Sequence, residues 1–591
     1  MKKIFKISIV VLTTILFASC NSSKSNNTSR LTGLSFNNPK NGNYIRNSSY
    51  EAEKASLGMV LIEGGSFTMG QVQDDVMFDW NTTPKKMHVR PFFMDETEVT
   101  NSEYFLYVQY IKDVFNPNEV DASGAKKYEH IYNSVLPDTL VWRKNLGNTD
   151  ILTQNYFRHP AYADYPVVGV SWLQANEYCK WRTNAVNLKK LIDGGHITNI
   201  FESDTIRNFF DTDRFLNDSD RLFTYMDGKK IDTAVTPAIY KRGVKTKRIR
   251  KKGEAKPGKD AFQGRRITQA DAILQESYRL PTEVEWEYAA KAIVENREYN
   301  NVRGRKKYAW NGKYTRSKER KYRGDQLANF KQSQGSYSGL PGWSSDGSDI
   351  PIRIKSYPPN AFGLYDMSGN VAEWVADVYR PIIDAKANDF NYFRGNVFTK
   401  KLMNTPDGKP IIVGDEENPT LANSRENDTI INGVAYGQLP NGTFRPIQLP
   451  GTIKREAITE IDAAFRTNFS QADNINISDG EVSSSRFYKK TGEKSKRPNM
   501  YNSPKAPIRS IDPVTGLEVI TYDSKNRSTL ISDETRVYKG GSWADREFWL
   551  DPAQRRYLPE YMATNFIGFR CVTDKLGSMD YRKRNNKTRT K

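Results

Sequence analysis

The chain has 591 residues, of which 37% are hydrophobic and 12% aromatic, and its formal net charge is +19. This length allows a sizeable core, and the polar stretches between aromatic-rich blocks predict long surface insertions around that core. Four scattered histidines, with no i,i+4 pair and no metal-ligand spacing, argue against a histidine-based metal centre. They are His88, His130, His159 and His196.

The N-terminus has the features of a secretory signal. Met1 to Lys6 is basic, Ile7 to Phe17 is apolar but too short to span a bilayer, and small residues precede Cys20. Cys20 resembles the cysteine of a bacterial lipobox, so we expect 1–19 to be a lipoprotein signal peptide and Cys20 to carry acyl chains such as palmitate. These chains would anchor the protein to a membrane. The alternative is an ordinary signal peptide with an incidental cysteine.

The segment 20–53 is rich in Asn and Ser and has no hydrophobic periodicity, which predicts a flexible tether. The blocks that follow predict one elaborated domain over 54–574. A basic tail, 575–591, closes the chain and is expected to be disordered when free. Three insertions are expected within the domain, at about 116–159, 183–277 and 381–535.

Three helices are predicted inside the domain from apolar spacing and capping residues. Short strands are expected at Val167 to Val170 and at Phe566 to Val572. The first helix spaces its apolar face through Tyr104, Phe105, Val108, Ile111 and Phe115. The helices and their N-caps are Asn101 to Val114 after Thr100, Trp172 to Trp181 after Ser171, and Trp286 to Ala292 after Thr282.

The insertions differ in character. In the middle one, Lys241 to Arg266 holds twelve Lys or Arg residues against two acidic residues. Such a run is typical of a solvated loop, and its functional alternative is docking to an acidic surface. The third insertion has short apolar pieces such as Thr429 to Ile431, followed by the turn-like pair Asn432-Gly433, so it predicts small strands laid over the core.

Six ordered blocks resemble the formylglycine-generating-enzyme (sulfatase-modifying factor) domain, a variant of the C-type-lectin-like fold. The resemblance implies an α+β fold that is loop-rich, low in regular secondary structure and interrupted by long insertions. The blocks are Met59 to Gly70, Met94 to Asn101, Val168 to Trp172, Arg279 to Ala290, Phe362 to Trp374, and Gly540 to Cys571.

Catalytic members of this family carry two reactive cysteines before the closing Gly-Phe-Arg motif. Counting back from Gly568 places those positions at Glu547 and Pro552, neither of which offers a thiolate for oxygen chemistry or copper binding. The resemblance therefore implies a pseudoenzyme without copper. Apart from Cys20, only Cys179 and Cys571 remain, and they are either a disulfide or two buried thiols.

The family resemblance also implies two structural calcium sites. The first would use the side chains of Asp366 and Glu373 with the carbonyls of Gly369 and Val371. The second would use the side chains of Asn329 and Asp346 with the carbonyls of Phe330 and Ser348. The alternative is that these residues cap turns without a metal.

Other charged residues of the blocks receive structural interpretations. Arg570 and Glu373 are expected to form a buried pair that holds the domain together. Glu283, Glu285 and Glu287 invite an acid-base interpretation, but their alternation on a short helix predicts different faces, with roles in capping and buried hydrogen bonding.

Further runs resemble the gliding-motility lipoproteins of Bacteroidetes over nearly the whole mature chain. This resemblance implies a lipid-anchored scaffold in gliding motility and type IX secretion, which stabilises or docks a related lipoprotein of the same fold and its ring proteins. With no acidic run after Cys20, the periplasmic face of the outer membrane is favoured. The runs are Val72 to Met77, Leu136 to Arg143, Gly324 to Lys331 and Val375 to Ile382.

Basic segments would meet the partner in this scaffold. Charge alone would also favour nucleic acid, but export of the chain excludes that partner. Two alternatives stay open: a glycan-binding lectin-like module, indicated by the many aromatic residues, and an active formylglycine-generating oxidase. The tail residues expected to bind the partner are Arg582, Lys583, Arg584, Lys587, Arg589 and Lys591.

Overall fold

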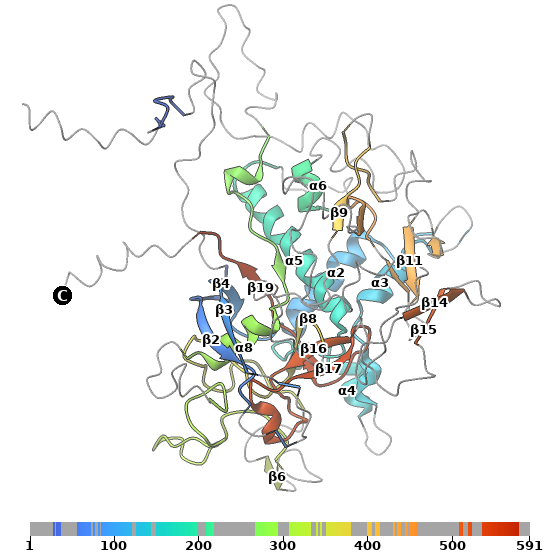
Figure 1. Ribbon diagram of the computed structural model, residues 1–591. Helices are drawn as coiled ribbons and strands as arrows, with labels where there is room; N and C mark the ends of the chain where they lie inside the picture. Colours follow the sequence, from blue (N-terminus) through green and yellow to red (C-terminus); the bar gives the residue numbers. More distant parts are fainter. Residues whose placement is uncertain are drawn as a thin grey trace, which may run out of the picture.

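Two four-stranded sheets form the centre of the fold in this computed structural model, and each combines strands from distant parts of the chain (Figure 1). The described residues are 28–29, 31–36, 56–72, 75–76, 81–82, 84–120, 124, 126–143, 149–197, 209–217, 266–293, 306–332, 339–340, 343–344, 350–379, 399–404, 408–413, 429–431, 434–438, 444–446, 448–457, 507–511, 518–522 and 535–577.

The first sheet is antiparallel and has the order β1-β4-β19-β5. Its central pair joins the N-terminal and C-terminal blocks, because Val572 lies opposite Met94. The strands are β1 (Met59–Ile62), β4 (Phe92–Asp95), β19 (Val572–Asp574) and β5 (Tyr278–Arg279).

The second sheet has the order β17-β16-β8-β18, in which β18 runs parallel to β8 and the other pairs are antiparallel. Every described position of β16 is buried, as are most of β8, so this sheet lies inside the fold. The strands are β17 (Arg556–Pro559), β16 (Thr535–Lys539), β8 (Ala372–Val378) and β18 (Ile567–Gly568).

The single strand predicted over 566–572 is wrong. The chain instead forms β18 in one sheet and β19 in the other, and Phe569, Arg570 and Cys571 pass between the sheets. All three side chains are fully buried at this crossing. A run of buried residues reads as one strand in the sequence, although here it serves two sheets.

The strand predicted at 167–170 is also wrong. Gly169 has a φ of +76°, and a Cβ at this position would lie 2.4 Å from the carbonyl oxygen of Asp138. The backbone there bonds to loops: the Gly169 N–H donates to the Thr564 oxygen and its oxygen accepts from Asp138 N–H. The segment is therefore extended chain held by close packing, which requires glycine.

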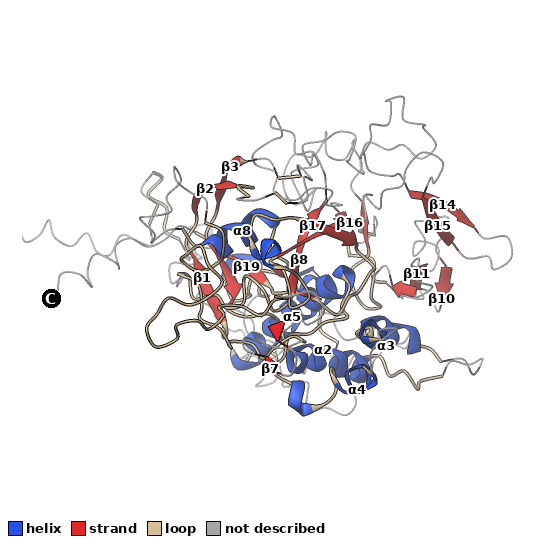
Figure 2. Cartoon of the chain, turned by 90° about the horizontal axis from the view of Figure 1, so that it is seen from below, coloured by secondary structure: helices blue, strands red, loops and turns tan. Residues whose placement is uncertain are grey.

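The three predicted helices are present, and each starts at its predicted N-cap with a complete capping box. α5 runs well beyond the predicted end, so the first residues of the expected middle insertion are helical. Figure 2 shows α8 apart from the group formed by α2, α3 and α4. The helices are α2 (Asn101–Val114), α5 (Trp172–Asp193) and α8 (Glu283–Lys291).

The buried face of α2 differs in one position from the prediction. Tyr104, Val108 and Ile111 are buried as expected, but Phe105 is exposed and Tyr107 is buried in its place. The rings of Tyr107 and Trp181 lie 5.3 Å apart, and this contact packs α2 against α5.

The insertions contribute smaller elements. The predicted strand at 429–431 is confirmed as β10, which pairs with β11 across the turn-like pair, itself outside the described residues. The first insertion holds α3 (Glu129–Val135), η3 (Thr139–Trp142) and α4 (Asp150–Asn155). The remaining elements are β2 (Gly65–Met69), β3 (Lys85–Val89), η4 (Pro160–Tyr162), α6 (Thr212–Asn217), η7 (Gln269–Asp271), β6 (Gly339–Leu340), β7 (Trp343–Ser344), β9 (Thr399–Lys401), β10 (Thr429–Ile431), β11 (Val434–Gln438), β12 (Phe444–Pro446), β13 (Arg455–Ala457), β14 (Pro507–Ile511), β15 (Glu518–Tyr522) and η10 (Glu547–Leu550).

Candidate functional site

The two positions predicted to replace the reactive cysteines lie at η10 and directly after it. The side chain of Glu547 is half exposed, and it accepts hydrogen bonds from the Tyr308 hydroxyl and, at 3.4 Å, from Lys307 Nζ. Pro552 is buried and has no titratable group. Neither residue carries a thiol, so this part of the structure offers a carboxylate held by a phenol and an ammonium group.

The two cysteines of the folded domain lie elsewhere, in contact with each other. Cys179 on α5 and Cys571 before β19 are both buried, and their Sγ atoms are 3.4 Å apart. Burial raises the pKa of Cys571 well above its ordinary value, so its thiol stays protonated at neutral pH. A buried, protonated thiol is a poor nucleophile.

The expected pair of Arg570 and Glu373 is confirmed, and it lies at the crossing between the sheets. Arg570 Nη2 and Nε donate to the two Glu373 oxygens at 2.6 and 2.7 Å. Trp286 Nε1 donates to the same carboxylate at 2.8 Å. Arg570 also donates to the carbonyls of Asp95 and Tyr365 at 3.1 and 2.9 Å, so one buried guanidinium ties several blocks together.

Two further buried carboxylates lie beside this pair. Glu98 accepts from Asn370 Nδ2 at 2.8 Å and from the Val371 N–H at 3.2 Å. Burial raises the pKa of Glu98 well above its ordinary value, and Asp366 and Glu373 raise it further. Burial likewise raises the pKa of Asp366 to about 6. The sequence reasoning missed Glu98, whose only signal is an acidic residue inside the block 94–101.

The residues of the first expected calcium site are adjacent, but Glu373 is engaged. Both of its carboxylate oxygens accept hydrogen bonds from Arg570, whose positive charge opposes a cation at the same oxygens. Within the described ranges, no group of three or more His, Cys, Asp or Glu side chains is arranged to hold a metal ion. As arranged here, Glu373 does not fit the role of a calcium ligand, and the site stays a prediction.

The second expected calcium site is described only in part, since Asp346 and Ser348 lie outside the described residues. Asn329 and Phe330 are buried. The Asn370 N–H donates to the Asn329 oxygen at 2.9 Å, and a Cβ on Gly369 would lie 2.7 Å from that oxygen. The structure therefore brings residues of the two expected sites into contact through their backbones.

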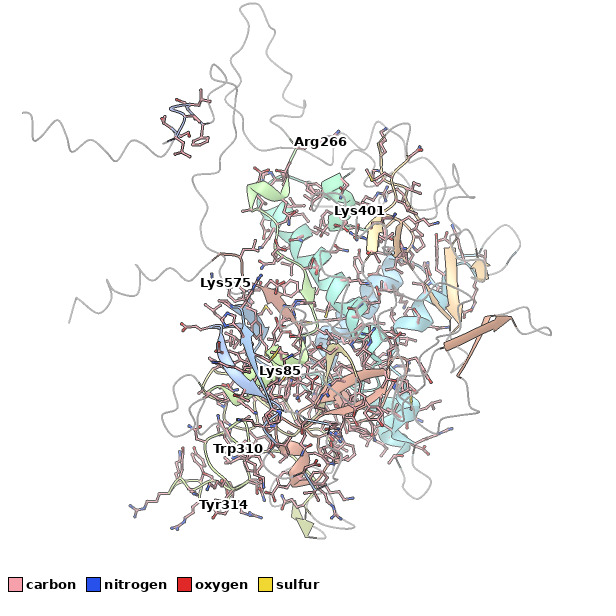
Figure 3. The ribbon with its side chains drawn as sticks, viewed as in Figure 1. Lys85, Arg266, Trp310, Tyr314, Lys401 and Lys575 are labelled. Carbon is pink, nitrogen blue, oxygen red and sulfur yellow. The ribbon has the colours of Figure 1, made fainter. Side chains whose placement is uncertain are left out.

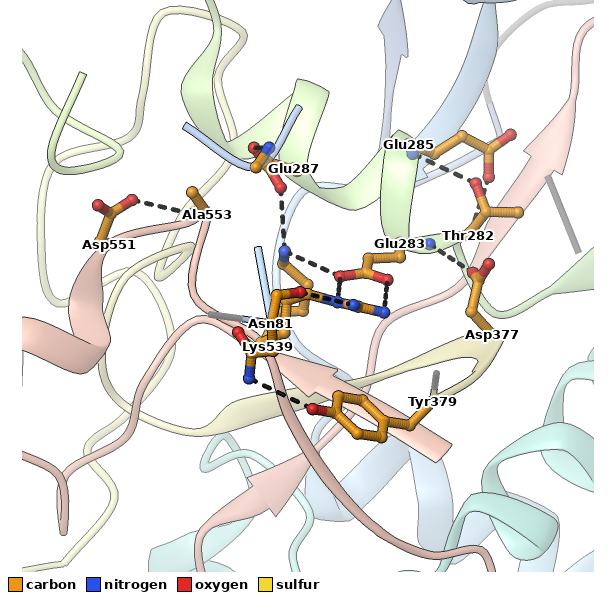
Figure 4. Close-up of polar contacts among 12 residues, drawn as sticks. Asn81, Thr282, Glu283, Glu285, Glu287, Asp377, Tyr379, Lys539, Asp551 and Ala553 are labelled. Atoms are coloured by element: carbon orange, nitrogen blue, oxygen red, sulfur yellow. Dashed lines mark hydrogen bonds and ion pairs between the residues drawn. The ribbon is translucent and has the colours of Figure 1, made fainter. Parts of the chain in front are cut away.

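A separate buried charge network joins α8 to β16 (Figure 4). Lys539 Nζ lies 3.3 Å from Glu283 and 3.0 Å from Glu287, so these two glutamates share a face and the prediction of separate faces is wrong for them. They are four residues apart, which is one helical turn. Glu285 faces elsewhere and pairs with Arg279 at 2.7 Å.

The remaining partners of the network come from the segment after Pro552 and from α8 itself. Arg555 donates to both Glu283 oxygens at 2.6 and 2.9 Å, and Lys291 Nζ donates to Glu287 at 2.8 Å. Although burial opposes ionisation, Arg555 and Lys539 hold the pKa of Glu283 below its ordinary value. Such a compensated cluster is structural, and the predicted capping and hydrogen-bonding roles of these glutamates are confirmed.

Cys20 and the cationic tail residues from Arg582 to Lys591 lie outside the described residues, so lipidation and tail binding stay predictions. In the part of the chain that the structure describes, no helix combines the length and apolar character needed to cross a bilayer.

Residues 46–412 match the model of the sulfatase-modifying factor enzyme 1-like domain, which is more than half of the chain. The blocks, the mixed helix and strand architecture, and this match define the class. The chain belongs to the formylglycine-generating-enzyme (FGE-sulfatase) domain family.

Relatives include both active and inactive proteins. The chain is 22% identical over 345 residues to the formylglycine-generating enzyme of Streptomyces coelicolor, which covers 56% of this chain and 73% of that protein. It is 30% identical over 145 residues to the inactive C-alpha-formylglycine-generating enzyme 2 of Mus musculus, a match that covers 22% of this chain and 39% of that protein. The family therefore accommodates loss of activity.

Among solved structures, PvdO from Pseudomonas aeruginosa is similar with 14% identity and a TM-score of 0.31, over 87% of this chain and 94% of that chain. Treponema denticola variable protein 1 is similar with 15% identity and a TM-score of 0.29, over 87% of this chain and 94% of that chain.

Proposed function

We propose that this chain is a non-catalytic member of the family that works as a membrane-anchored docking scaffold. The observation that supports the proposal most is the placement of its thiols. Of three cysteines in the chain, Cys20 lies in the N-terminal signal-like segment, and Cys179 and Cys571 are buried against each other. The two positions that would carry reactive thiols hold Glu547 and Pro552.

The particular role that we propose is in gliding motility and type IX secretion. The four runs described above resemble those of the gliding-motility lipoprotein GldJ of Bacteroidetes. Acyl chains on Cys20 would hold the protein at the periplasmic face of the outer membrane, and the rigid two-sheet core would position basic segments toward a related lipoprotein and its ring proteins. Complementary charge would steer that encounter and weaken with salt.

The lack of catalysis is tested with a cysteine-containing sulfatase peptide. The purified chain, supplied with copper and oxygen, is expected to leave the peptide cysteine unconverted, because no pair of accessible thiols exists to perform the oxidation. Mass spectrometry of the peptide gives the answer, with the Streptomyces coelicolor enzyme as the positive control. Any conversion above the rate without protein overturns the proposal.

The scaffold role is tested by removing residues 582–591 from the native protein. The deletion is expected to leave the folded core intact, because these residues follow the last strand of the first sheet. Partner abundance in the outer membrane and gliding are expected to fall. If both are unchanged, the tail is not a docking element.

Calcium is proposed as a structural ion at the second expected site, of which Asn329 and Phe330 are described, and its contribution is measured by thermal melting. One bound ion stabilises the folded state according to its concentration relative to its Kd, so a 100-fold excess over Kd adds about 2.7 kcal/mol. The melting midpoint is therefore expected to rise between EGTA and millimolar calcium, with magnesium as the control. An unchanged midpoint means that calcium does not bind the folded domain and overturns this proposal.

A further inference from the structure

A small hairpin, residues 313–327, follows α8 in the chain and is rich in exposed basic and aromatic side chains. Its two arms are joined by the Leu327 N–H to the Thr315 oxygen and the Ser317 N–H to the Asp325 oxygen, both at 2.8 Å. Arg316 Nη1 donates to the Gly324 oxygen at 2.6 Å and closes the turn. The backbone of this cationic hairpin is therefore organised in advance of any binding.

Positive charge dominates the cationic hairpin. It has six cationic residues against Glu319 and Asp325, and all six are exposed. Among the described residues, Arg320 and Arg323 are in no ion pair. A guanidinium recognises carboxylates through a planar fork, so these two arginines suit an acidic ligand. The six cationic residues are Lys313, Arg316, Lys318, Arg320, Lys321 and Arg323.

Two tyrosines on the same hairpin are exposed, Tyr314 at 62% and Tyr322 at 48%. Lys318 Nζ lies 4.8 Å from the Tyr314 ring and Lys321 Nζ lies 5.0 Å from the Tyr322 ring. These contacts hold lysine and ring side by side. Tyrosine and arginine together are the residues enriched at the energetic centres of protein interfaces.

The base of the cationic hairpin is fixed to the body of the protein. Trp310 stacks on Tyr308 with 4.7 Å between ring centroids, and Trp310 Nε1 donates to the backbone carbonyl oxygen of Tyr314 at 3.0 Å. Tyr308 in turn donates to Glu547 on η10. In Figure 3, Trp310 and Tyr314 lie at the lower edge of the molecule, where side chains extend outward.

We propose that the cationic hairpin docks an acidic peptide segment of a partner protein. This inference rests on the proposed scaffold function and names the chemistry of the partner. The net charge of +4 over 313–327 supplies complementarity, and the two arginines and two tyrosines supply directional contacts. The fixed backbone favours a defined peptide over a lipid headgroup layer, which requires only charge.

Binding is measured by fluorescence anisotropy of a labelled peptide rich in Asp, Glu and Tyr, added to the full chain at physiological salt. The hairpin variant combines Lys318→Gln, Arg320→Gln, Lys321→Gln and Arg323→Gln. It is expected to weaken binding about 30-fold, as four exposed ion pairs are lost together. A control with the same change in charge combines Lys86→Gln, Arg90→Gln, Lys112→Gln and Arg158→Gln, and less than about 3-fold loss is expected.

A charge-conserving variant separates recognition from simple attraction. The variant Arg320→Lys with Arg323→Lys keeps the charge but removes both planar guanidinium groups, so about 3-fold weaker binding is expected. Near-ultraviolet circular dichroism checks that every variant is folded. Equal losses in the hairpin and control variants overturn the proposal, as does binding of phosphatidylglycerol vesicles by the hairpin in preference to the peptide. Neither outcome changes the result of the sulfatase-peptide assay, so this inference fails separately from the loss of catalysis.

Discussion

Replacing Arg570 with methionine is expected to lower the free energy of unfolding by about 3–5 kcal/mol, the usual result of breaking a buried ion pair by removing one partner. Glu373 would then stay buried with a single donor, Trp286, and the neighbouring Glu98 and Asp366 would lose their compensating charge. The carbonyls of Asp95 and Tyr365 would also lose their donor.

The measurement is denaturant unfolding followed by tryptophan fluorescence, with Arg353→Met as the matched control. Arg353 pairs with Asp164 at 2.6 Å, but both side chains are more than half exposed, so a change within about 0.5 kcal/mol is expected. Similar effects of the two substitutions would mean that the crossing between the sheets does not depend on Arg570.

Purification under oxidising conditions is expected to yield a disulfide between Cys179 and Cys571. Their Sγ atoms are 3.4 Å apart, and a covalent bond of about 2.05 Å needs only a small movement of the two side chains. The bond would close a loop of 392 residues. In the chain-entropy model, a loop of this length stabilises the folded state by about 6 kcal/mol.

The raised pKa of Cys571 makes its thiol unreactive in the folded protein, so the bond is expected to form during folding. Free thiols are counted after denaturation, and melting midpoints are compared with and without reductant. The Cys179→Ala variant is the control, because its midpoint should not respond to reductant. A full count of free thiols in the oxidised protein would show that the pair stays reduced.

Local features of the fold could be predicted from the sequence. Thr100, Ser171 and Thr282 each start a helix, because a hydroxyl cap and its return partner lie three residues apart and need no distant contact. The ends of elements were less predictable. α5 extends to Asp193, and its last turns bury Leu188 and Leu191 in a cluster with Phe210, Phe215 and Ile267, which lie later in the chain.

The candidate site also contains some residues that could be predicted from the sequence and others that could not. The positions of Glu547 and Pro552, and the pairing of Arg570 with Glu373, followed from blocks whose order is fixed along the chain. The cationic hairpin was not predicted, although its sequence is basic and aromatic, because only the folded backbone shows that Arg320 and Arg323 are exposed while Trp310 is held on Tyr308.

The sequence by itself determined the family blocks, the helix starts, and the absence of cysteine at the two expected positions, since each depends on residues close together in the chain. Only the tertiary structure decided which charges meet. Lys539 lies 256 residues from Glu283 in the sequence, and its ammonium group still donates to the Glu283 carboxylate. Likewise, the segment 566–572 contributes one strand to each of the two sheets. Burial makes the free energy of a charge depend on its partners in space, and those partners are set by the packing of distant segments.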